Sequence, residues 1–182
     1  MFLLTCQSYA CKPADLGVPK SNQGNHNVVD QDRLDSVEHE DLICEDDCFD
    51  VVLSDDEQEA YYLINDHRSD TGLSDFVLHQ ALVEIARIHS MSMASGALEL
   101  GHDGFEERVE EILCHFNYDS YLAAENVGYA GLDNGAEKAV ENWLSSEGHR
   151  SNIEGPYQIS GIGEYKNQDQ VFFTQIFLSI NP

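Results

Sequence analysis

The residues with the clearest chemical potential lie in the C-terminal half of the chain. His102 stands in GHDGF (101–105), Glu125 in AENVG (124–128) and His149 in WLSSEGHRSNI (143–153). Each motif is short, polar and close to glycine, which is typical of loops that carry function on a rigid scaffold. The three side chains therefore define a candidate site, provided that the fold brings them together.

Two imidazoles and a carboxylate support two kinds of chemistry. They suit a divalent metal such as Zn²⁺, for which imidazole and carboxylate are common ligands. They also suit general acid–base work, in which Glu125 would hold one imidazole in a fixed tautomer. No HExxH motif is present, so the spacing alone leaves both interpretations open.

Other reactive side chains have plainer interpretations. Ser145, Ser146 and Ser151 lie near His149, but the G-x-S-x-G pattern of a nucleophile elbow is absent. Cys114 falls within a helical pattern, where packing is a better expectation than nucleophilic attack. His89 lies on the apolar stripe of a helix and is expected to be a hydrogen-bonded core residue.

Helices followed by strands are expected to position these motifs. Ser54 and Glu57 form a capping box that opens a first helix, which Thr71-Gly72 ends. Asp103 is a candidate cap for a later helix. Three further helices are predicted over residues 75–94, 105–116 and 135–146. Strands are predicted over residues 159–165 and 170–180, joined by a turn at 166–169, with a short third strand over 122–129. Helices followed by an antiparallel hairpin indicate an α+β fold.

Two glycines in one of these predicted strands indicate close packing against another element. Gly161 and Gly163 flank Ile162 inside the strand pattern, which indicates close approach of another backbone.

The charge of the chain excludes some classes of function. Its 182 residues contain 34 Asp and Glu against 9 Lys and Arg, a net charge of −25. Nucleic-acid binding is excluded as a class because it needs a basic patch, and docking to an anionic membrane is disfavoured for the same reason. The acidic surface fits either a solubilising role or the capture of cations such as Ca²⁺. No apolar run is long enough to predict a transmembrane segment.

The N-terminal third of the chain differs in composition from the rest. Residues 1–10 resemble the remnant of a signal peptide, with an ordinary irregular terminus as the alternative. Residues 11–53 are predicted to be an acidic, irregular leader, and residues 54–182 a single domain. Cleavage after Ala10 would leave four cysteines and up to two disulfides, whose pairing is open: Cys11, Cys44, Cys48 and Cys114.

From Ser54 to Ile180 the chain resembles the CAP superfamily, which comprises cysteine-rich secretory, antigen 5 and pathogenesis-related proteins and is also called the SCP domain. It looks most like the secreted bacterial form. The resemblance rests on six motifs in order, namely IN-x-x-R with GL (64–73), L-x-x-x-A-x-x-HS (82–90), HDGF with Arg108, AENV (124–127), WLSSEGHRSNI (143–153), and GIG with FFTQIF (161–163 and 172–177).

The resemblance implies an α-β-α sandwich with a small antiparallel sheet between helical layers. It also implies a central cleft in which two histidines face two acidic residues, carried over here as His102, Glu125 and His149. The fourth position, often Glu three residues after the Trp, is Ser146 in this chain. Glu147 replaces a proline that is common in the bacterial motif and would point elsewhere on a helix.

Some members of the family bind a divalent metal, often zinc, through the two histidines, and the same is expected here. The resemblance favours a protein that is secreted or held in the cell envelope and that binds an unknown ligand, lipid or protein. The alternatives are a metal-dependent hydrolase or peptidase, with Glu125 and His149 as candidate catalytic groups, and a structural envelope protein. Catalysis is the less favoured expectation, since no oxyanion stabiliser is evident and fold does not imply function.

Overall fold

The computed structural model describes residues 51–181. The predicted signal-peptide remnant and almost all of the predicted acidic leader lie outside the described residues, as do four of the five cysteines. The elements in chain order are α1 (Asp55–Asp70), β1 (Val77–Leu78), α2 (Gln80–Ala94), α3 (Phe105–Leu113), β2 (Ser120–Gly131), α4 (Gly135–Ser145), α5 (Glu147–Ile153), β3 (Ile159–Lys166) and β4 (Gln170–Asn181).

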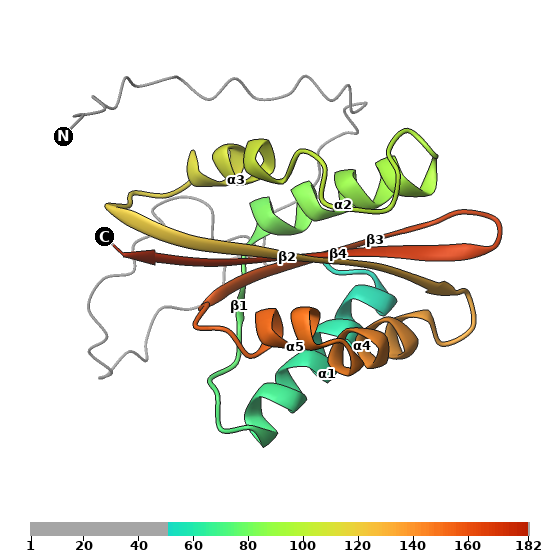
Figure 1. The fold of residues 1–182 in the computed structure, drawn as a ribbon, viewed down its shortest axis with the longest axis horizontal. Coiled ribbons are helices and arrows are strands. Elements are labelled where there is room, and N and C mark those ends of the chain that lie inside the picture. The colour runs from blue at the N-terminus through green and yellow to red at the C-terminus, as the bar shows by residue number, and fades with distance from the viewer. Residues whose placement is uncertain (1–50, 182) are drawn as a thin grey trace, which may run out of the picture. The chain divides into compact units, whose positions relative to one another are not determined.

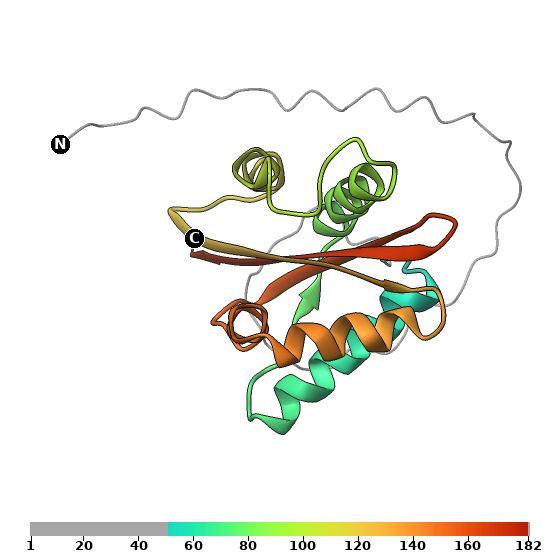
Figure 2. The same ribbon diagram turned by 45° about the vertical axis from the view of Figure 1, so that its right-hand side comes forward.

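These elements form three layers, with the sheet in the middle. Helices α2 and α3 cover one face, and α1, α4 and α5 cover the other (Figure 1; Figure 2 shows the layers from a second side). The strand order is β1-β3-β4-β2, with β1 parallel to β3 and the other pairs antiparallel. The fold is therefore the expected α+β sandwich.

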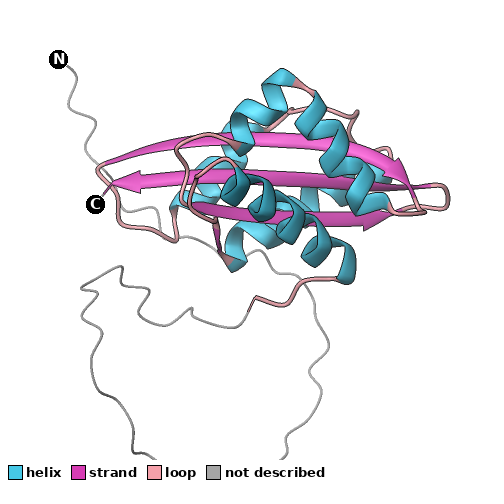
Figure 3. Cartoon of the chain, turned by 90° about the horizontal axis from the view of Figure 1, so that it is seen from below, coloured by secondary structure: helices cyan, strands magenta, loops and turns pink. Residues whose placement is uncertain are grey.

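Strand β2 lies at an edge of this sheet. Figure 3 shows the three long strands side by side, with the strand that leads to the C-terminus in the middle. The pairing of β2 with β4 runs from Ser120↔Asn181 to Gly131↔Gln170. This strand extends beyond the predicted residues 122–129, because it follows β4 over its whole length.

Each face of the sheet has its own apolar core, as alternation along strands requires. On one face α2 and α3 pack Leu82, Ile112 and other apolar residues against Ile176 and Leu178 of β4. On the opposite face Trp143 packs among the apolar residues of α1, α4 and α5, with Phe173 and Phe177. The site described below lies where both helical layers reach the β2 edge.

The first helix begins as its sequence predicts. The Ser54 hydroxyl accepts from the Glu57 backbone N–H, and the Glu57 carboxylate accepts from the Ser54 backbone N–H, which is the full capping box. Glu57 is buried and also accepts from Arg87 Nε at 2.8 Å and from the Glu164 backbone N–H at 3.0 Å. This carboxylate thus ties α1 to both α2 and β3.

The second helix begins later than predicted. Its first residue is Gln80, because Val77 and Leu78 pair with Ile159 and Ser160 in the parallel β1–β3 ladder. The His79 imidazole accepts from the Ala81 backbone N–H and caps the helix. A non-local strand pairing therefore overrides the local helical pattern.

Glycines bring α2 directly onto β3. A Cβ atom at Gly161 would overlap backbone atoms of Leu82 and Val83, and one at Gly163 would overlap those of Ala86 and Arg87. The prediction of close backbone approach is confirmed.

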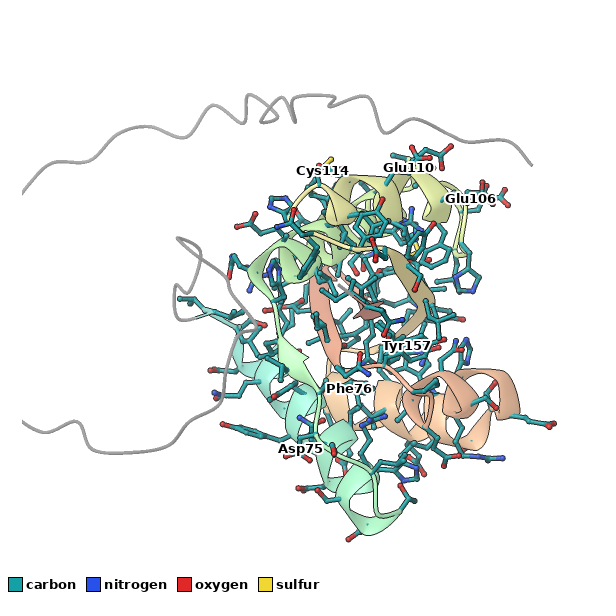
Figure 4. The ribbon with its side chains drawn as sticks, turned by 90° about the vertical axis from the view of Figure 1, so that its left-hand side faces the viewer. Asp75, Phe76, Glu106, Glu110, Cys114 and Tyr157 are labelled. Carbon is teal, nitrogen blue, oxygen red and sulfur yellow. The ribbon has the colours of Figure 1, made fainter. Side chains whose placement is uncertain are left out.

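The third helix begins at Phe105 as predicted, but its cap and its last residue differ from the prediction. Gly104, in the left-handed region at φ 77°, is its N-cap, so the prediction that Asp103 caps it is wrong. The helix ends at Leu113, and Cys114 is exposed instead of packed. Figure 4 shows Glu106, Glu110 and Cys114 along the outer side of α3.

No helix among residues 51–181 is long and apolar enough to cross a membrane.

Candidate functional site

Glu125 is the centre of the site. It lies on β2, on the face that α2 and α3 cover, and its side chain is 1% exposed. Arg108 of α3 donates to both carboxylate oxygens, from Nε to Oε2 at 2.9 Å and from Nη2 to Oε1 at 2.8 Å. Such a two-pronged pair fixes the plane of the carboxylate and compensates its buried charge.

His102 binds the same carboxylate from the loop between α2 and α3. Its Nδ1 lies 3.0 Å from Glu125 Oε1. An ionised carboxylate only accepts hydrogen bonds, so Nδ1 carries a proton and Nε2 remains as the outer nitrogen. The His102 side chain is 53% exposed, so this outer nitrogen belongs to an accessible imidazole.

The loop that carries His102 is held by a buried histidine. His89 of α2 donates from Nε2 to the Gly101 carbonyl at 2.9 Å, and this nitrogen lies 3.9 Å from Glu125 Oε1. Burial lowers the pKa of His89, and the charge of Arg108 acts in the same direction, which favours the neutral imidazole. His89 is thus the hydrogen-bonded core residue that was expected, and it also supports the loop of the site.

His149 approaches from the opposite helical layer, on the short helix α5. Asn126 Nδ2 donates to the His149 carbonyl at 3.1 Å, and Asn152 Nδ2 donates to Asn126 Oδ1 at 2.9 Å and to the Glu125 carbonyl at 3.3 Å. These amides join α5 to the edge of β2. Burial lowers the pKa of His149, and the nearby His102 lowers it further.

A pocket of about 380 Å³ lies beside His149. Trp143 forms part of its wall, and its indole Nε1 donates to the Val127 carbonyl on the outer edge of β2 at 3.1 Å. Ser146, between α4 and α5, also lines this pocket, whereas Glu147 does not and is exposed. The full lining consists of Leu100, Val127, Gly128, Tyr129, Ala139, Asn142, Trp143, Ser146 and His149.

The structure therefore brings the sequence-predicted residues to one edge of the sheet. His102 and Glu125 are in direct contact, and His149 lies near enough to His102 for a charge on His102 to lower the pKa of His149. Ser146 lines the pocket beside His149. Their chemical roles stay predictions.

Arg108 follows the HDGF motif, but its role at Glu125 was not predicted from the sequence. The available signal was its place as the only basic residue in the acidic helix FEERVEEIL, three positions after Phe105. A lone arginine among carboxylates, next to a candidate histidine motif, favours pairing with a buried acid.

Two imidazoles are chemically suitable ligands for a divalent cation such as Zn²⁺. The outer nitrogen of His102 is oriented by a carboxylate, as in many metal-bound histidines, and the lowered pKa of His149 favours the neutral form that binds metal. Among residues 51–181 no group of three or more His, Cys, Asp or Glu side chains is arranged to hold a metal ion. Any further ligands would then come from water or from a bound molecule.

The fold is that of a CAP-type protein. The family model for CAP, the cysteine-rich secretory protein family, matches residues 61–177. The chain belongs to this family.

Bacterial proteins are among its relatives. An uncharacterized membrane protein of Bacillus subtilis, YlbC, is 31% identical over 127 residues, which are 67% of this chain and 34% of the relative. This chain thus spans about a third of the length of that curated relative.

Two solved bacterial structures are also similar. An extracellular protein of Bacillus anthracis that contains an SCP domain is 28% identical with a TM-score of 0.55, covering 70% of this chain and 40% of its own. A cysteine-rich secretory protein of Staphylococcus aureus is 26% identical with a TM-score of 0.53, covering 68% and 38%.

Proposed function

We propose that this protein is a secreted or cell-envelope binding module whose site holds a divalent cation between His102 and His149. The observation that carries the proposal is the Arg108–Glu125–His102 chain, which fixes one imidazole with its outer nitrogen accessible. The extracellular relative from Bacillus anthracis supports the proposed location.

The contacts of Glu125 favour binding over hydrolysis. A general base must reach the proton that it removes, with an oxygen available to accept it. Here both oxygens of Glu125 accept from Arg108, and one also accepts from His102. Glu125 is thus better suited to orient His102 than to activate water, and Ser146 adds no second carboxylate.

His102 and His149 would bind the cation. Glu125 would not bind it but would orient the imidazole of His102. A bound Zn²⁺ supplies a positive charge and open positions for an anionic or carbonyl group. The chain's own residues keep the imidazole of His102 in one tautomer and orientation through Glu125 and Arg108, and keep α5 in place through Asn126 and Asn152.

Calorimetric titration with Zn²⁺ tests the proposal. We expect wild type to bind at one site that is lost when His102→Ala and His149→Ala are combined, because two imidazoles are the proposed ligands. His67→Ala is the matched control, because it removes one imidazole from α1, outside the site. Its partner Glu154 follows α5, but both side chains are partly exposed, so the loss of this pair should leave the site intact. Equal affinity of wild type and the double variant would refute the metal site.

A further inference from the structure

The N-terminal half of β2 is an open edge of the sheet. In an antiparallel ladder the N–H and C=O of one residue point to the same side, and those of the next residue point to the other side. The carbonyls of Glu125 and Val127 point away from β4, because side chains of α5 and α4 donate to them. Tyr121 and Ala123 alternate in step with these residues along the continuous ladder, so their backbone groups also point outward.

Nothing in the described part of the chain pairs with this half of the edge. The outward N–H and C=O groups of Tyr121 and Ala123 accept and donate no hydrogen bond among residues 51–181. Natural edge strands usually carry a charge or a proline that prevents pairing with another chain, and residues 120–124, Ser-Tyr-Leu-Ala-Ala, contain neither. This segment is therefore a template for one more strand.

Exposed apolar side chains flank the open edge on both faces of the sheet. By alternation with Glu125, Tyr121 lies on the face that α2 and α3 cover, and it is 44% exposed. Its ring packs edge to face against that of Tyr118, with 5.6 Å between the centroids. Leu122 is 54% exposed on the opposite face. An added strand would cover both faces with its own alternating side chains.

The charge beside this edge determines which partner fits. Residues 105–124 carry exposed carboxylates at Glu106, Glu107, Glu110, Glu111 and Asp119. The only Lys or Arg in this range is Arg108, whose charge Glu125 compensates through two hydrogen bonds. Figure 4 shows Glu106 and Glu110 on the outer side of α3, one helical turn apart. A basic segment is attracted here, whereas a second copy of this chain would bring the same carboxylates together.

We propose that the edge of β2 over residues 120–124 binds an extended, basic peptide segment of a partner protein, which adds to the sheet as a further strand. Its backbone would bond to Tyr121 and Ala123. Its basic side chains would lie on the face of α3, beside the carboxylates, and its alternate apolar side chains would cover Leu122. None of these contacts involves the proposed metal site.

Amide hydrogen exchange of the full chain, followed by NMR, tests this mode of binding. The probe is the blocked heptapeptide Ac-TKVKVKT-NH₂, which alternates basic and β-branched residues. In the free protein we expect the N–H groups of Tyr121 and Ala123 to exchange fast, whereas that of Leu122 points to β4 and is protected. Saturation with the peptide should slow exchange at Tyr121 and Ala123 by about tenfold or more.

Two control peptides separate charge from backbone pairing. Ac-TEVEVET-NH₂ keeps the strand pattern with the opposite charge, and calorimetry should show at least about tenfold weaker binding. The basic peptide with methylated backbone nitrogens keeps its charge but cannot donate to β2, so it should also bind at least about tenfold more weakly.

A matched pair of double variants locates the binding. Glu106→Gln combined with Glu110→Gln removes charge beside the edge and should weaken binding of the basic peptide by about threefold or more. Glu137→Gln combined with Glu141→Gln is the control, because it removes the same charge from exposed positions of α4, which packs under the other half of β2 (Figure 1) and should leave the affinity almost unchanged.

Three results with the peptides and variants would overturn the proposal: no protection of Tyr121 and Ala123 by the basic peptide, equal binding of either control peptide, or equal weakening by the two double variants. Protection of these amides in the free protein would overturn it as well. Protection that rises with protein concentration would identify a second copy of this chain as the occupant, and protection independent of concentration would identify another segment of the same chain.

Discussion

At the scale of single residues, Glu125 determines what the site can do. Its side chain is almost fully buried, yet it carries a charge that only Arg108 and His102 compensate at hydrogen-bond distance among the described residues. A buried carboxylate with a bidentate arginine is costly to disturb, because removing one partner leaves an uncompensated charge. The orientation of the accessible His102 nitrogen therefore depends on Arg108, which holds the carboxylate that binds His102.

Replacing Arg108 should reveal this dependence in the stability of the fold. We expect Arg108→Gln to lower the free energy of unfolding by about 3 kcal/mol, because Glu125 loses its charged partner while staying buried. Urea denaturation followed by circular dichroism measures the change.

Arg150→Gln is the matched control for Arg108→Gln. Arg150 forms a long pair with Glu154 at 4.0 Å, on side chains that are 41% and 36% exposed, so we expect a loss of about 1 kcal/mol or less. Equal losses in the two variants would show that the Arg108–Glu125 pair is not compensating a buried charge.

At the scale of elements, the spacing between α2 and the sheet decides where the site residues lie. Helix α2 carries His89 and leads into the loop of His102, so its distance from the sheet sets the position of this loop relative to Glu125 on β2. That distance is set by Gly161 and Gly163, over which the backbone of α2 passes.

Adding one methyl group at this contact should push the layers apart. We expect Gly163→Ala to destabilise the protein by about 3 kcal/mol, because the new Cβ meets backbone atoms of Ala86 and Arg87 that cannot rotate away. The thermal midpoint measured by calorimetry reports the loss.

Gly131→Ala is the control for the glycine contact. Gly131 also lies in a strand, but its added Cβ meets nothing within 4 Å, so we expect a change within about 0.5 kcal/mol. A Gly163→Ala protein as stable as Gly131→Ala would mean that α2 does not need this close approach.

At the scale of the whole molecule, local signals predicted the elements and non-local contacts decided their ends and partners. The Ser54–Glu57 capping box and the Gly161–Gly163 pair are patterns of residues close together in the sequence. The helix start and the close backbone approach that they predict were both confirmed. The start of α2 was not, because Val77 pairs with Ile159, which lies far along the chain.

The same division holds for the candidate site. Motif resemblance indicated His102, Glu125 and His149, but the two-pronged bond of Arg108 requires knowing that Glu125 is buried against α3. Burial and orientation follow from the packing of layers, which no short motif encodes.

The net charge of −25 also acts on the molecule as a whole. Like charges repel in the compact state, and salt weakens this repulsion by shortening the Debye length from about 30 Å at 0.01 M to about 8 Å at 0.15 M. We therefore expect the thermal midpoint to rise by several degrees between these two NaCl concentrations.

The identity of the cation separates the two interpretations of the acidic surface. If the surface is simply solubilising, NaCl, choline chloride and CaCl₂ at matched ionic strength should raise the thermal midpoint equally, because screening depends on ionic strength alone. Capture of Ca²⁺ predicts an additional rise in CaCl₂ that saturates with concentration, because a ligand that binds only the folded state stabilises it by mass action. A midpoint that falls with added NaCl would contradict the predicted screening effect, since it would mean that attractive pairs such as Lys166–Asp56 and Arg87–Glu57 outweigh the repulsion among the other carboxylates.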